Sequence, residues 1–486
     1  MAKRKLSTFE RLRRGEKLRR SERNQLERQF QAEKPGWEVV HRDVAGIDVG
    51  GGSHFVAVDP QRTQQPVREF GSWTADLRKM VEWLRSCGVQ RVVMQTTGVY
   101  WIALQDVLEE AGFEVAVVDA RGTKSLPGRK SDVQECQWIR KLDLYGLLRE
   151  CFQAPSSIRA IRSIWRSRDR LVTDAGQSIQ RMQKVLTTMN VQLANTISDI
   201  AGVTGIAILR AILAGERDPW KLAKLRDGRI EASEEEIALS LEGNWREELL
   251  FELQQVMDCY DFQQKQLAEC DQKLKQYLSA QPTRQRDTAS VPETKGLPTK
   301  KRRGRKPKGS RAKPKKNQPD FDLESELRRV MGVDLTRIDG INLITTQIIY
   351  SEIGPDFSAF PTEGHFASWL GLTPKKDISG GKVIKQRSTH VSNRVANALR
   401  MSAQSLSRSN SYLGARYRSL RGRLDGVIAV KAMARYLACL VHRMVTKGEA
   451  YVDRGAAYFE KKRHDRTLLL LRQKAAAVGM QLVPVI

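Results

Sequence analysis

Cysteine is scarce in this sequence, and long hydrophobic runs are absent. The six cysteines among 486 residues are scattered, without any C-x-x-C pair, so neither a zinc knuckle nor a disulfide framework is indicated. No apolar run approaches the roughly 20 residues of a membrane span, and the basic start MAKRKLSTFERLRRGEKLRR has no apolar core of the signal-peptide kind. We therefore expect a cytoplasmic protein with reduced thiols and no membrane partner.

Acidic residues are also in deficit. The chain has 83 Lys and Arg against 56 Asp and Glu, which leaves a formal net charge of +27. Solubility does not require so large an excess, so the balance indicates a polyanionic partner. Nucleic acid is the first candidate, and an anionic membrane surface is the alternative.

Composition and periodicity divide the chain into six segments. They are a basic N-terminal extension (1–42), an α/β domain (43–155), a helical region (156–285), a basic linker (286–320), a mainly helical C-terminal domain (321–460) and a tail helix (461–486). The extension carries 12 basic and 5 acidic side chains up to Lys34. A solvated tail and a nucleic-acid contact are both compatible with that balance.

The α/β domain begins with short apolar runs. Strands are predicted at 44–50, 54–59, 67–73, 91–95 and 113–120, and helices at 75–88 and 101–112. Three successive strands followed by alternating helices and strands indicate one mixed sheet with an antiparallel hairpin edge. That order suits an RNase H-like fold.

The helical region has apolar residues at three- and four-residue steps, which predicts long helices. A coiled coil that mediates self-association and packing within one chain both remain open.

The basic linker contains twelve basic residues and no acid between residues 295 and 316, so it cannot fold alone. Within it, RRGRKP resembles an AT-hook, whose Arg-Gly-Arg lies in a narrow minor groove. A lysine before the proline departs from the usual hook, so neutralisation of the nucleic-acid backbone and groove recognition both remain open. The candidate contacts are Arg302, Arg303, Arg305 and Lys306.

Residues 333–354 predict a helix, a DGI turn and a second helix. This pattern is similar to a helix-hairpin-helix, whose turn amides hold a DNA phosphate.

Four polar residues are expected to meet at one edge of the sheet. Asp48 lies in the first strand and Gln95 ends the fourth, while the i, i+3 spacing of Asp132 and Glu135 puts both carboxylates on one helical face. Such acids can hold Mg²⁺ for phosphodiester chemistry. The alternatives for Asp48 are a turn-capping role and the phosphate loop of sugar-kinase and actin-like ATPases. The latter needs a second Asp-Gly-Gly loop, which this sequence lacks.

The order of short motifs along the chain resembles one family. GIDVG, TTGVYW, PGRKSDVQECQW and YGLL are followed by DGI, SEIG, HFASWLGL, SGGK and NALR. Together they resemble the DEDD insertion-sequence transposases that also carry a catalytic serine, the bridge-RNA-guided recombinases. The resemblance covers most of residues 44–460. It implies a RuvC-like domain that supplies four acids and a C-terminal domain that supplies a serine nucleophile.

Carried over to this sequence, the resemblance makes Asp48 the first acid, Asp132 the third and Glu135 the fourth, where the family more often has Asp. Gln95 stands where the second acid is expected. An amide oxygen can coordinate Mg²⁺ but brings no negative charge. We expect the three remaining acids to support a Mg²⁺ site, with Gln95 as a neutral ligand.

The implied nucleophile is Ser379 in KKDISGGKVIKQRS. Its neighbouring glycines allow close approach to a phosphate, and nearby cations can stabilise the transition state. These cations are Lys376, Lys382, Lys385 and Arg387. A Ser-Gly-Gly is also an ordinary turn, and no hydrolase triad surrounds this serine. The acids and the serine would therefore form a composite site across two domains of one subunit or of two.

The resemblance implies a transposase-recombinase that cuts and rejoins DNA through a phosphoserine intermediate. Its implied partners are donor DNA, target DNA and a structured guide RNA. The implied assembly is a tetramer built as two dimers, with residues 156–280 as the dimer interface. The implied location is the prokaryotic cytoplasm, at the nucleoid. Two alternatives remain open: a catalytically impaired nucleic-acid binder, and a plain RuvC-like nuclease that leaves Ser379 idle.

Overall fold

The computed structural model describes residues 8–13, 21–22, 37–96, 98–119, 131–284, 317–379, 382–387, 393–448, 454–481 and 483. Helix α1 (Thr8–Arg13) lies in the basic extension. The chain forms two compact units, residues 1–153 and 154–486, which are described separately below. No described helix is long and apolar enough to cross a bilayer. None of the six cysteines is in a disulfide.

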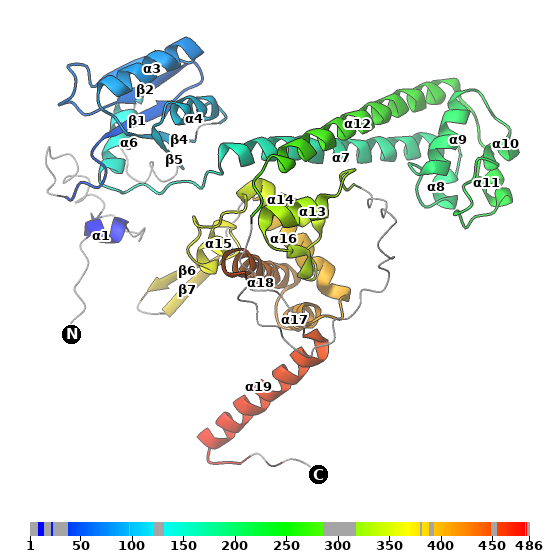
Figure 1. Cartoon of the computed structure of the whole chain (residues 1–486). Coiled ribbons are helices and arrows are strands. Elements are labelled where there is room, and N and C mark those ends of the chain that lie inside the picture. The colour runs from blue at the N-terminus through cyan, green and yellow to red at the C-terminus, as the bar shows by residue number, and fades with distance from the viewer. Residues whose placement is uncertain are drawn as a thin grey trace. The chain divides into compact units, whose positions relative to one another are not determined.

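The first unit contains a five-stranded mixed sheet (Figure 1). The strands are β1 (Val44–Val49), β2 (Ser53–Ala57), β3 (Val67–Gly71), β4 (Arg91–Gln95) and β5 (Glu114–Val118). Their order is β3-β2-β1-β4-β5. The β1–β2 and β2–β3 pairs are antiparallel, and the β1–β4 and β4–β5 pairs are parallel. The predicted mixed sheet with a hairpin edge is confirmed, and its topology fits a RuvC-like fold.

Helices cover both faces of this sheet. They are α3 (Thr74–Ser86), α4 (Trp101–Glu110) and α6 (Asp132–Leu144). Alternate residues of β1 point to opposite faces. Ile47 and Val49 join the core formed with α3 and α4, and Val44 packs with Ile139 of α6. Asp48 shares the parity of Val44 and therefore faces α6.

A glycine lets α6 approach β1 closely. A Cβ atom on Gly46 would lie 2.3 Å from the carbonyl oxygen of Cys136 and 2.4 Å from the backbone nitrogen of Arg140. These are backbone atoms of α6 and cannot swing away. The absence of a side chain at Gly46 therefore fixes the distance between α6 and the central strand.

The second unit begins with two long helices, α7 (Ser156–Thr188) and α12 (Glu247–Ser279). They are antiparallel, because Arg168 of α7 pairs with Asp271 of α12 while the later Ser178 pairs with the earlier Gln263. The long helices predicted for 156–285 are confirmed. They pack against each other within one chain, and a coiled-coil seam between copies stays a prediction.

Four short helices connect the far ends of this pair (Figure 1). They are α8 (Leu193–Thr196), α9 (Val203–Leu213), α10 (Pro219–Ala223) and α11 (Glu234–Ser240). Buried residues of α9, including Ile208 and Ile212, join Leu253 of α12 in one hydrophobic core. We call the acidic stretch within this region, residues 231–252, the acidic tip.

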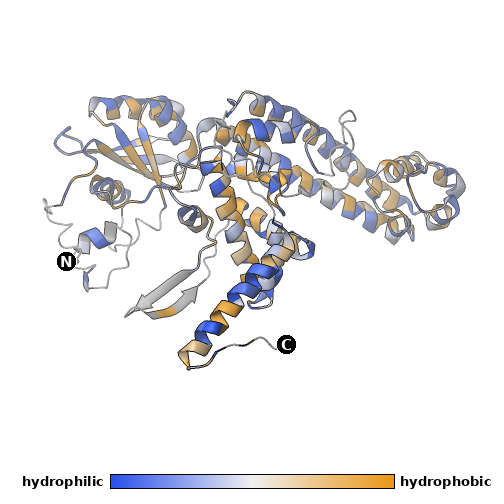
Figure 2. Ribbon diagram, turned by 60° about the horizontal axis from the view of Figure 1, so that its bottom comes forward, coloured by the Kyte–Doolittle hydropathy of each residue, from blue (hydrophilic) through white to orange (hydrophobic). Residues whose placement is uncertain are grey.

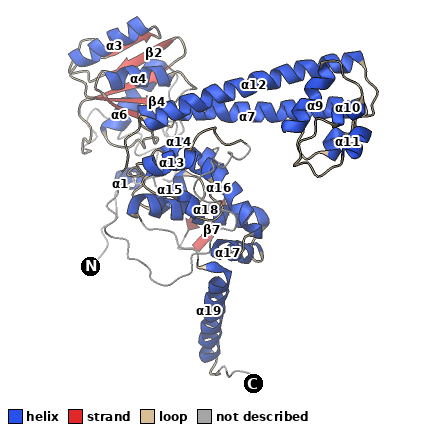
Figure 3. Ribbon diagram, turned by 45° about the vertical axis from the view of Figure 1, so that its right-hand side comes forward, coloured by secondary structure: helices blue, strands red, loops and turns tan. Residues whose placement is uncertain are grey.

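The remainder of the second unit is almost entirely helical (Figure 3). Its elements are α13 (Leu323–Met331), η2 (Leu335–Arg337), α14 (Leu343–Ile353), α15 (Glu363–Trp369), β6 (Lys375–Ser379), β7 (Lys382–Arg387), α16 (Arg394–Ser405), η3 (Leu406–Arg408), α17 (Tyr412–Arg421), α18 (Gly426–Lys447) and α19 (Gly455–Ala477). Helix α14 is the most deeply buried of them: eight of its residues, from Thr345 to Ile353, are buried.

The helix-hairpin-helix prediction is wrong in its first helix. Only the three-residue 3-10 helix η2 precedes the DGI turn, because Gly332 ends α13 in a left-handed conformation and leaves too few residues for an α-helix. Gly340 of the turn has a φ of +88°, and a Cβ atom there would lie 2.7 Å from the carbonyl oxygen of Ser402. Gly340 therefore packs against α16.

The AT-hook-like segment, with Arg302, Arg303, Arg305 and Lys306, lies outside the described residues. The chain on both sides of residues 285–316 is anchored. The backbone nitrogen of Arg284 donates to the carbonyl oxygen of Arg329 at 3.1 Å, and that of Asp320 donates to the carboxylate of Asp271 at 3.1 Å. The basic linker thus leaves from one helical body and returns to it.

Candidate functional site

Asp48 and Gln95 lie side by side at the carboxyl ends of two parallel strands. Ile47 of β1 is in register with Met94 of β4, and each of the two polar residues is the next along its strand. Gln95 is 3% exposed, while Asp48 is half-buried in a strand whose other residues are buried. Strand pairing therefore brings these two residues together, as the sequence predicts.

Helix α6 brings the other two acids to the same edge. Asp132 and Glu135 both lie in its first turn. The amide nitrogen Nε2 of Gln95 donates to Oε1 of Glu135 at 2.9 Å, and this bond joins the end of β4 to the start of α6. Ser131 caps the helix, because its Oγ accepts from the backbone nitrogen of Gln134 at 3.4 Å. The N-terminal end of a helix also favours carboxylates electrostatically.

The carboxyl group of Asp48 is strongly perturbed. Its pKa is raised from 3.8 to about 6, chiefly by burial and also by the negative charges of Glu135 and Asp132, against a lowering by the backbone N–H of Val49. Burial disfavours the ionised form, and neighbouring like charges do the same. A bound cation would offset both the burial of this carboxylate and its repulsion by the two neighbouring acids.

No three His, Cys, Asp or Glu side chains in the described part of the chain converge closely enough to hold a metal ion as they stand. The donor set nevertheless fits a hard cation. Asp48, Asp132 and Glu135 offer carboxylate oxygens, the ligands that Mg²⁺ prefers, and their charges interact across the edge of the sheet. Asp132 is exposed and Glu135 is partly exposed, so both side chains can rotate toward Asp48 to complete a set of metal ligands.

An exposed apolar segment at the start of α4 was missed by sequence reasoning. Val99 and Tyr100 precede α4 and are 70% and 52% exposed, and Ile102 in the first turn of α4 is 42% exposed. The ring of Tyr100 lies against Gly51 in the β1–β2 turn, at 3.3 Å from where a Cβ atom would stand. The signal was in TTGVYW, whose apolar residues Val99, Tyr100 and Trp101 lie at the start of α4 without being buried. This segment therefore offers an exposed aromatic ring against the β1–β2 turn, which follows the strand that carries Asp48.

Ser379 is the last residue of β6, at the turn of a hairpin. Strands β6 and β7 form a two-stranded sheet of their own (Figure 1), in which Ser379 is in register with Lys382. Gly380 and Gly381 lie outside the described residues. The predicted cations all fall on these two strands: Lys376, Lys382, Lys385 and Arg387. The backbone therefore gathers the serine and four positive residues on one hairpin.

The hairpin emerges from an aromatic cluster. Phe366 of α15 contacts Phe357, Phe360 and Trp369 at ring-centroid distances of 5.2, 5.2 and 6.2 Å. His442 of α18 bonds through Nε2 to the carbonyl oxygen of Phe360 at 2.8 Å. This packing fixes the segment from which β6 starts.

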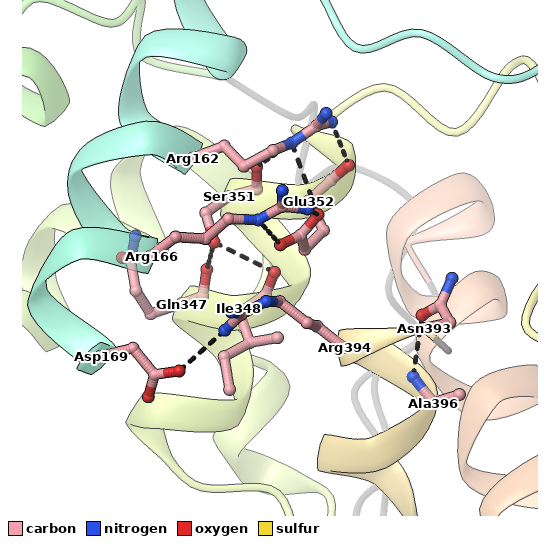
Figure 4. Close-up of polar contacts among 10 residues, drawn as sticks. All are labelled: Arg162, Arg166, Asp169, Gln347, Ile348, Ser351, Glu352, Asn393, Arg394 and Ala396. Atoms are coloured by element: carbon pink, nitrogen blue, oxygen red, sulfur yellow. Dashed lines mark hydrogen bonds and ion pairs between the residues drawn. The ribbon is translucent and has the colours of Figure 1, made fainter. Parts of the chain in front are cut away.

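Helix α7 is tied to the helices around the hairpin (Figure 4). Arg166 makes a two-pronged contact with the Glu352 carboxylate at 2.9 and 2.7 Å. Arg162 donates to the carbonyl oxygens of Ser351 and Glu352 at 3.2 and 2.7 Å, which satisfies the C-terminal end of α14. Paired arginine-carboxylate contacts are specific in geometry, so the long helix pair is joined firmly to the C-terminal helices.

A second contact reaches the segment that follows the hairpin (Figure 4). Arg394, the first residue of α16, pairs with Asp169 of α7 at 2.8 Å. The side chain of Asn393 caps α16 by accepting from the backbone nitrogen of Ala396 at 3.0 Å. The chain leaving β7 is therefore held at α7.

Residues 45–191 match a family model described as a transposase, the DEDD type of IS110 elements. Residues 334–418 match the transposase model of the IS116/IS110/IS902 family. The chain carries IS110-family transposase domains. The first transposase match covers the sheet, the acids and α7, and the second includes the β6–β7 hairpin. Helix α19 lies beyond both. A search of curated proteins finds no match for this chain.

Proposed function

We propose that this chain is a DNA transposase-recombinase that works through a phosphoserine intermediate. The observation that carries the proposal is the meeting of Asp48, Gln95, Asp132 and Glu135 at one sheet edge, within a matched transposase domain. The second matched domain carries Ser379 at the turn of a basic hairpin. The two domains would form one composite site.

In the proposed step, Ser379 Oγ attacks a DNA phosphorus atom. A serine–phosphorus bond forms, and the bond from phosphorus to one deoxyribose oxygen breaks. The proton lost by the serine hydroxyl balances the proton gained by the leaving oxygen. Attack by the hydroxyl of a second DNA strand then rejoins DNA and restores the serine. The hairpin cations stabilise the negative charge on the phosphorus oxygens.

Asp48, Asp132 and Glu135 would hold Mg²⁺, and a bound Mg²⁺ supplies charge neutralisation for phosphodiester chemistry. Gln95 has a different task from the acid it replaces. As a hydrogen-bond donor to Glu135 it orients that carboxylate without adding a fourth negative charge. A three-acid site is the result.

The partners we propose are donor DNA, target DNA and a structured guide RNA, bound by a tetramer. The net charge of +27 supports a nucleic-acid complex, and base pairing with a guide would read sequence while the protein holds the backbone. The exposed apolar segment with Tyr100 would face DNA bases.

The test is recovery of a covalent protein–DNA adduct. The purified chain is incubated with Mg²⁺, transcribed RNA from the flanking non-coding end and DNA that carries both junctions, and the adduct is mapped by mass spectrometry. We expect it on Ser379. Ser379→Ala should abolish both adduct and rejoining. Continued cleavage by Ser379→Ala would instead identify a plain nuclease.

A second candidate function is a nucleic-acid binder without catalysis. The neutral Gln95 and the absence of a ready three-acid cage among the described residues favour it. Gln95→Glu separates the two. A wild-type chain that is inert, with Mg²⁺-dependent recombination gained by Gln95→Glu, would establish the binder. Activity already present in the wild-type chain would establish the enzyme.

A further inference from the structure

Helix α19 leaves most of its surface uncovered. Its first turns pack on α17, where Tyr412 contacts Tyr458 and Phe459 at ring-centroid distances of 6.3 and 5.3 Å. From there every residue between Glu460 and Lys474 is exposed, and no residue of the helix is buried. The helix points away from the other C-terminal helices in two views (Figures 1 and 3).

The exposed part of α19 is unusually apolar for a free helix. Leu468, Leu469, Leu470 and Leu471 are 38%, 57%, 48% and 45% exposed. Successive helical residues are turned by about 100° from one another, so four in a row point to nearly every side. Figure 2 shows hydrophobic and hydrophilic residues side by side along this helix. Contiguous exposed leucines indicate a surface that another macromolecule covers.

The same stretch is strongly basic. Residues 461–474 carry six cations and a single acid, Asp465. The cations are Lys461, Lys462, Arg463, Arg466, Arg472 and Lys474. Nucleic acid would match the charge but would leave the leucines uncovered. A partner that is both acidic and apolar matches the two properties together.

The acidic tip of this chain has both properties. Residues 231–252 contain eight glutamates and one basic residue, Arg246, in a chain whose net charge is +27. All eight glutamates are exposed. Within the same stretch Leu239 is 60% exposed and Phe251 is 68% exposed. Val203 and Trp220, on neighbouring short helices, are 66% and 56% exposed.

In the folded second unit, α19 does not reach the acidic tip of the same chain. The acidic tip lies at the far end of the α7–α12 pair, and α19 points in a different direction (Figures 1 and 3). We propose that α19 of one copy binds the acidic tip of a second copy. The leucines would cover Leu239 and Phe251, and the cations would meet the glutamates. Two copies that exchange α19 make two identical contacts and close as a pair.

The experiment is sedimentation of the full-length chain without nucleic acid. Leu469→Glu with Leu470→Glu disables α19, and Glu234→Lys with Glu235→Lys disables the tip. Each variant should raise the dissociation constant of the assembly at least tenfold. Both changes lie on exposed side chains, so melting temperature and helix content should stay unchanged. Trp73→Ala removes an apolar side chain of the first unit that is even more exposed, at 78%, and should have no effect on assembly.

A charge exchange makes the test specific. Lys461→Glu with Lys462→Glu should weaken association, and adding Glu234→Lys with Glu235→Lys to the same chain should restore it. A monomeric wild-type chain, or assembly unaffected by either disabling pair, would overturn the proposal. So would loss of DNA or RNA affinity in the α19 variant with unchanged sedimentation, because α19 would then serve nucleic acid. The proposal would equally be refuted if the full-length chain bound anionic lipid vesicles through α19 while the α19 variant assembled like the wild-type chain.

Discussion

At the scale of single residues, Asp48 is held in an arrangement that costs stability. Its folded pKa of about 6 lies above the usual 3.8, so folding favours the neutral form. The stability contributed by this group is complete below pH 4 and is lost as the pH rises from about 4 to 6. A carboxylate kept in such a place is typical of a functional site.

Asp48→Asn should therefore stabilise the protein at pH 8 when no divalent cation is present. We expect a gain of about 1 to 2 kcal/mol, reduced from the full value of the shift because Asp48 is half-exposed. The gain should shrink at pH 4, where the wild-type carboxyl is neutral. Thermal melting in EDTA at both pH values measures this. A variant less stable than wild type at pH 8 would contradict the crowding of charges.

Gly46 sets the position of the acids on α6, and its replacement should strongly lower both stability and activity. Gly46→Ala places Cβ against two backbone atoms of α6, so α6 must move away from β1 or the sheet must distort. Overpacking of this kind costs about 3 kcal/mol or more. Thermal unfolding of the full chain should shift to lower temperature, and cleavage activity should fall. Gly52→Ala is the matched control, since nothing lies within 4 Å of its added Cβ.

At the scale of elements, the sequence predicts the first unit well and parts of the second poorly. Short apolar runs predict β1 to β5, because the central strands bury side chains on both faces of one sheet. The convergence of Asp48 and Gln95 follows from that topology. The close approach of α6 at Gly46 depends on a contact between residues 90 apart and leaves no periodic signal. Likewise, the helix expected before the DGI turn fails because the conformation of Gly332 ends α13 first.

The basic linker should contribute affinity and leave the fold intact. Replacing the twelve Lys and Arg of residues 295–316 by Gln should not change the melting temperature, because both flanks are anchored to the helical body. DNA affinity should fall, and its dependence on salt should become shallower. Titration by fluorescence anisotropy at several salt concentrations measures both. An unchanged salt dependence would remove the linker from the nucleic-acid interface.

A milder change distinguishes groove recognition from backbone neutralisation as the role of the AT-hook-like segment. Arg303→Lys with Arg305→Lys keeps the charge and removes the planar guanidinium groups that fit a narrow groove. Selective loss of affinity for A·T-rich DNA would support groove recognition. Equal affinity for all sequences would support neutralisation of the backbone.

At the scale of the whole molecule, the acids and the serine belong to separate compact units. Mixing an Asp48→Ala chain with a Ser379→Ala chain tests whether one site draws on two copies. If it does, mixed assemblies contain a site with intact acids and an intact serine, and recombination should reappear after subunit exchange. A mixture as inactive as its components would place both halves of the site in one chain.

The α7–α12 pair has a further consequence for the geometry of such assemblies. Each helix has 33 residues, which corresponds to about 50 Å, or roughly the length of 15 base pairs of B-form DNA. Because the pair is antiparallel and anchored at one end, we expect this span to set the separation between the acidic tip and the C-terminal helices. Removing equal numbers of residues from both helices shortens the α7–α12 pair by about 1.5 Å per residue pair. The permitted spacing between two bound DNA segments would then be set by helix length rather than by any contact with a base.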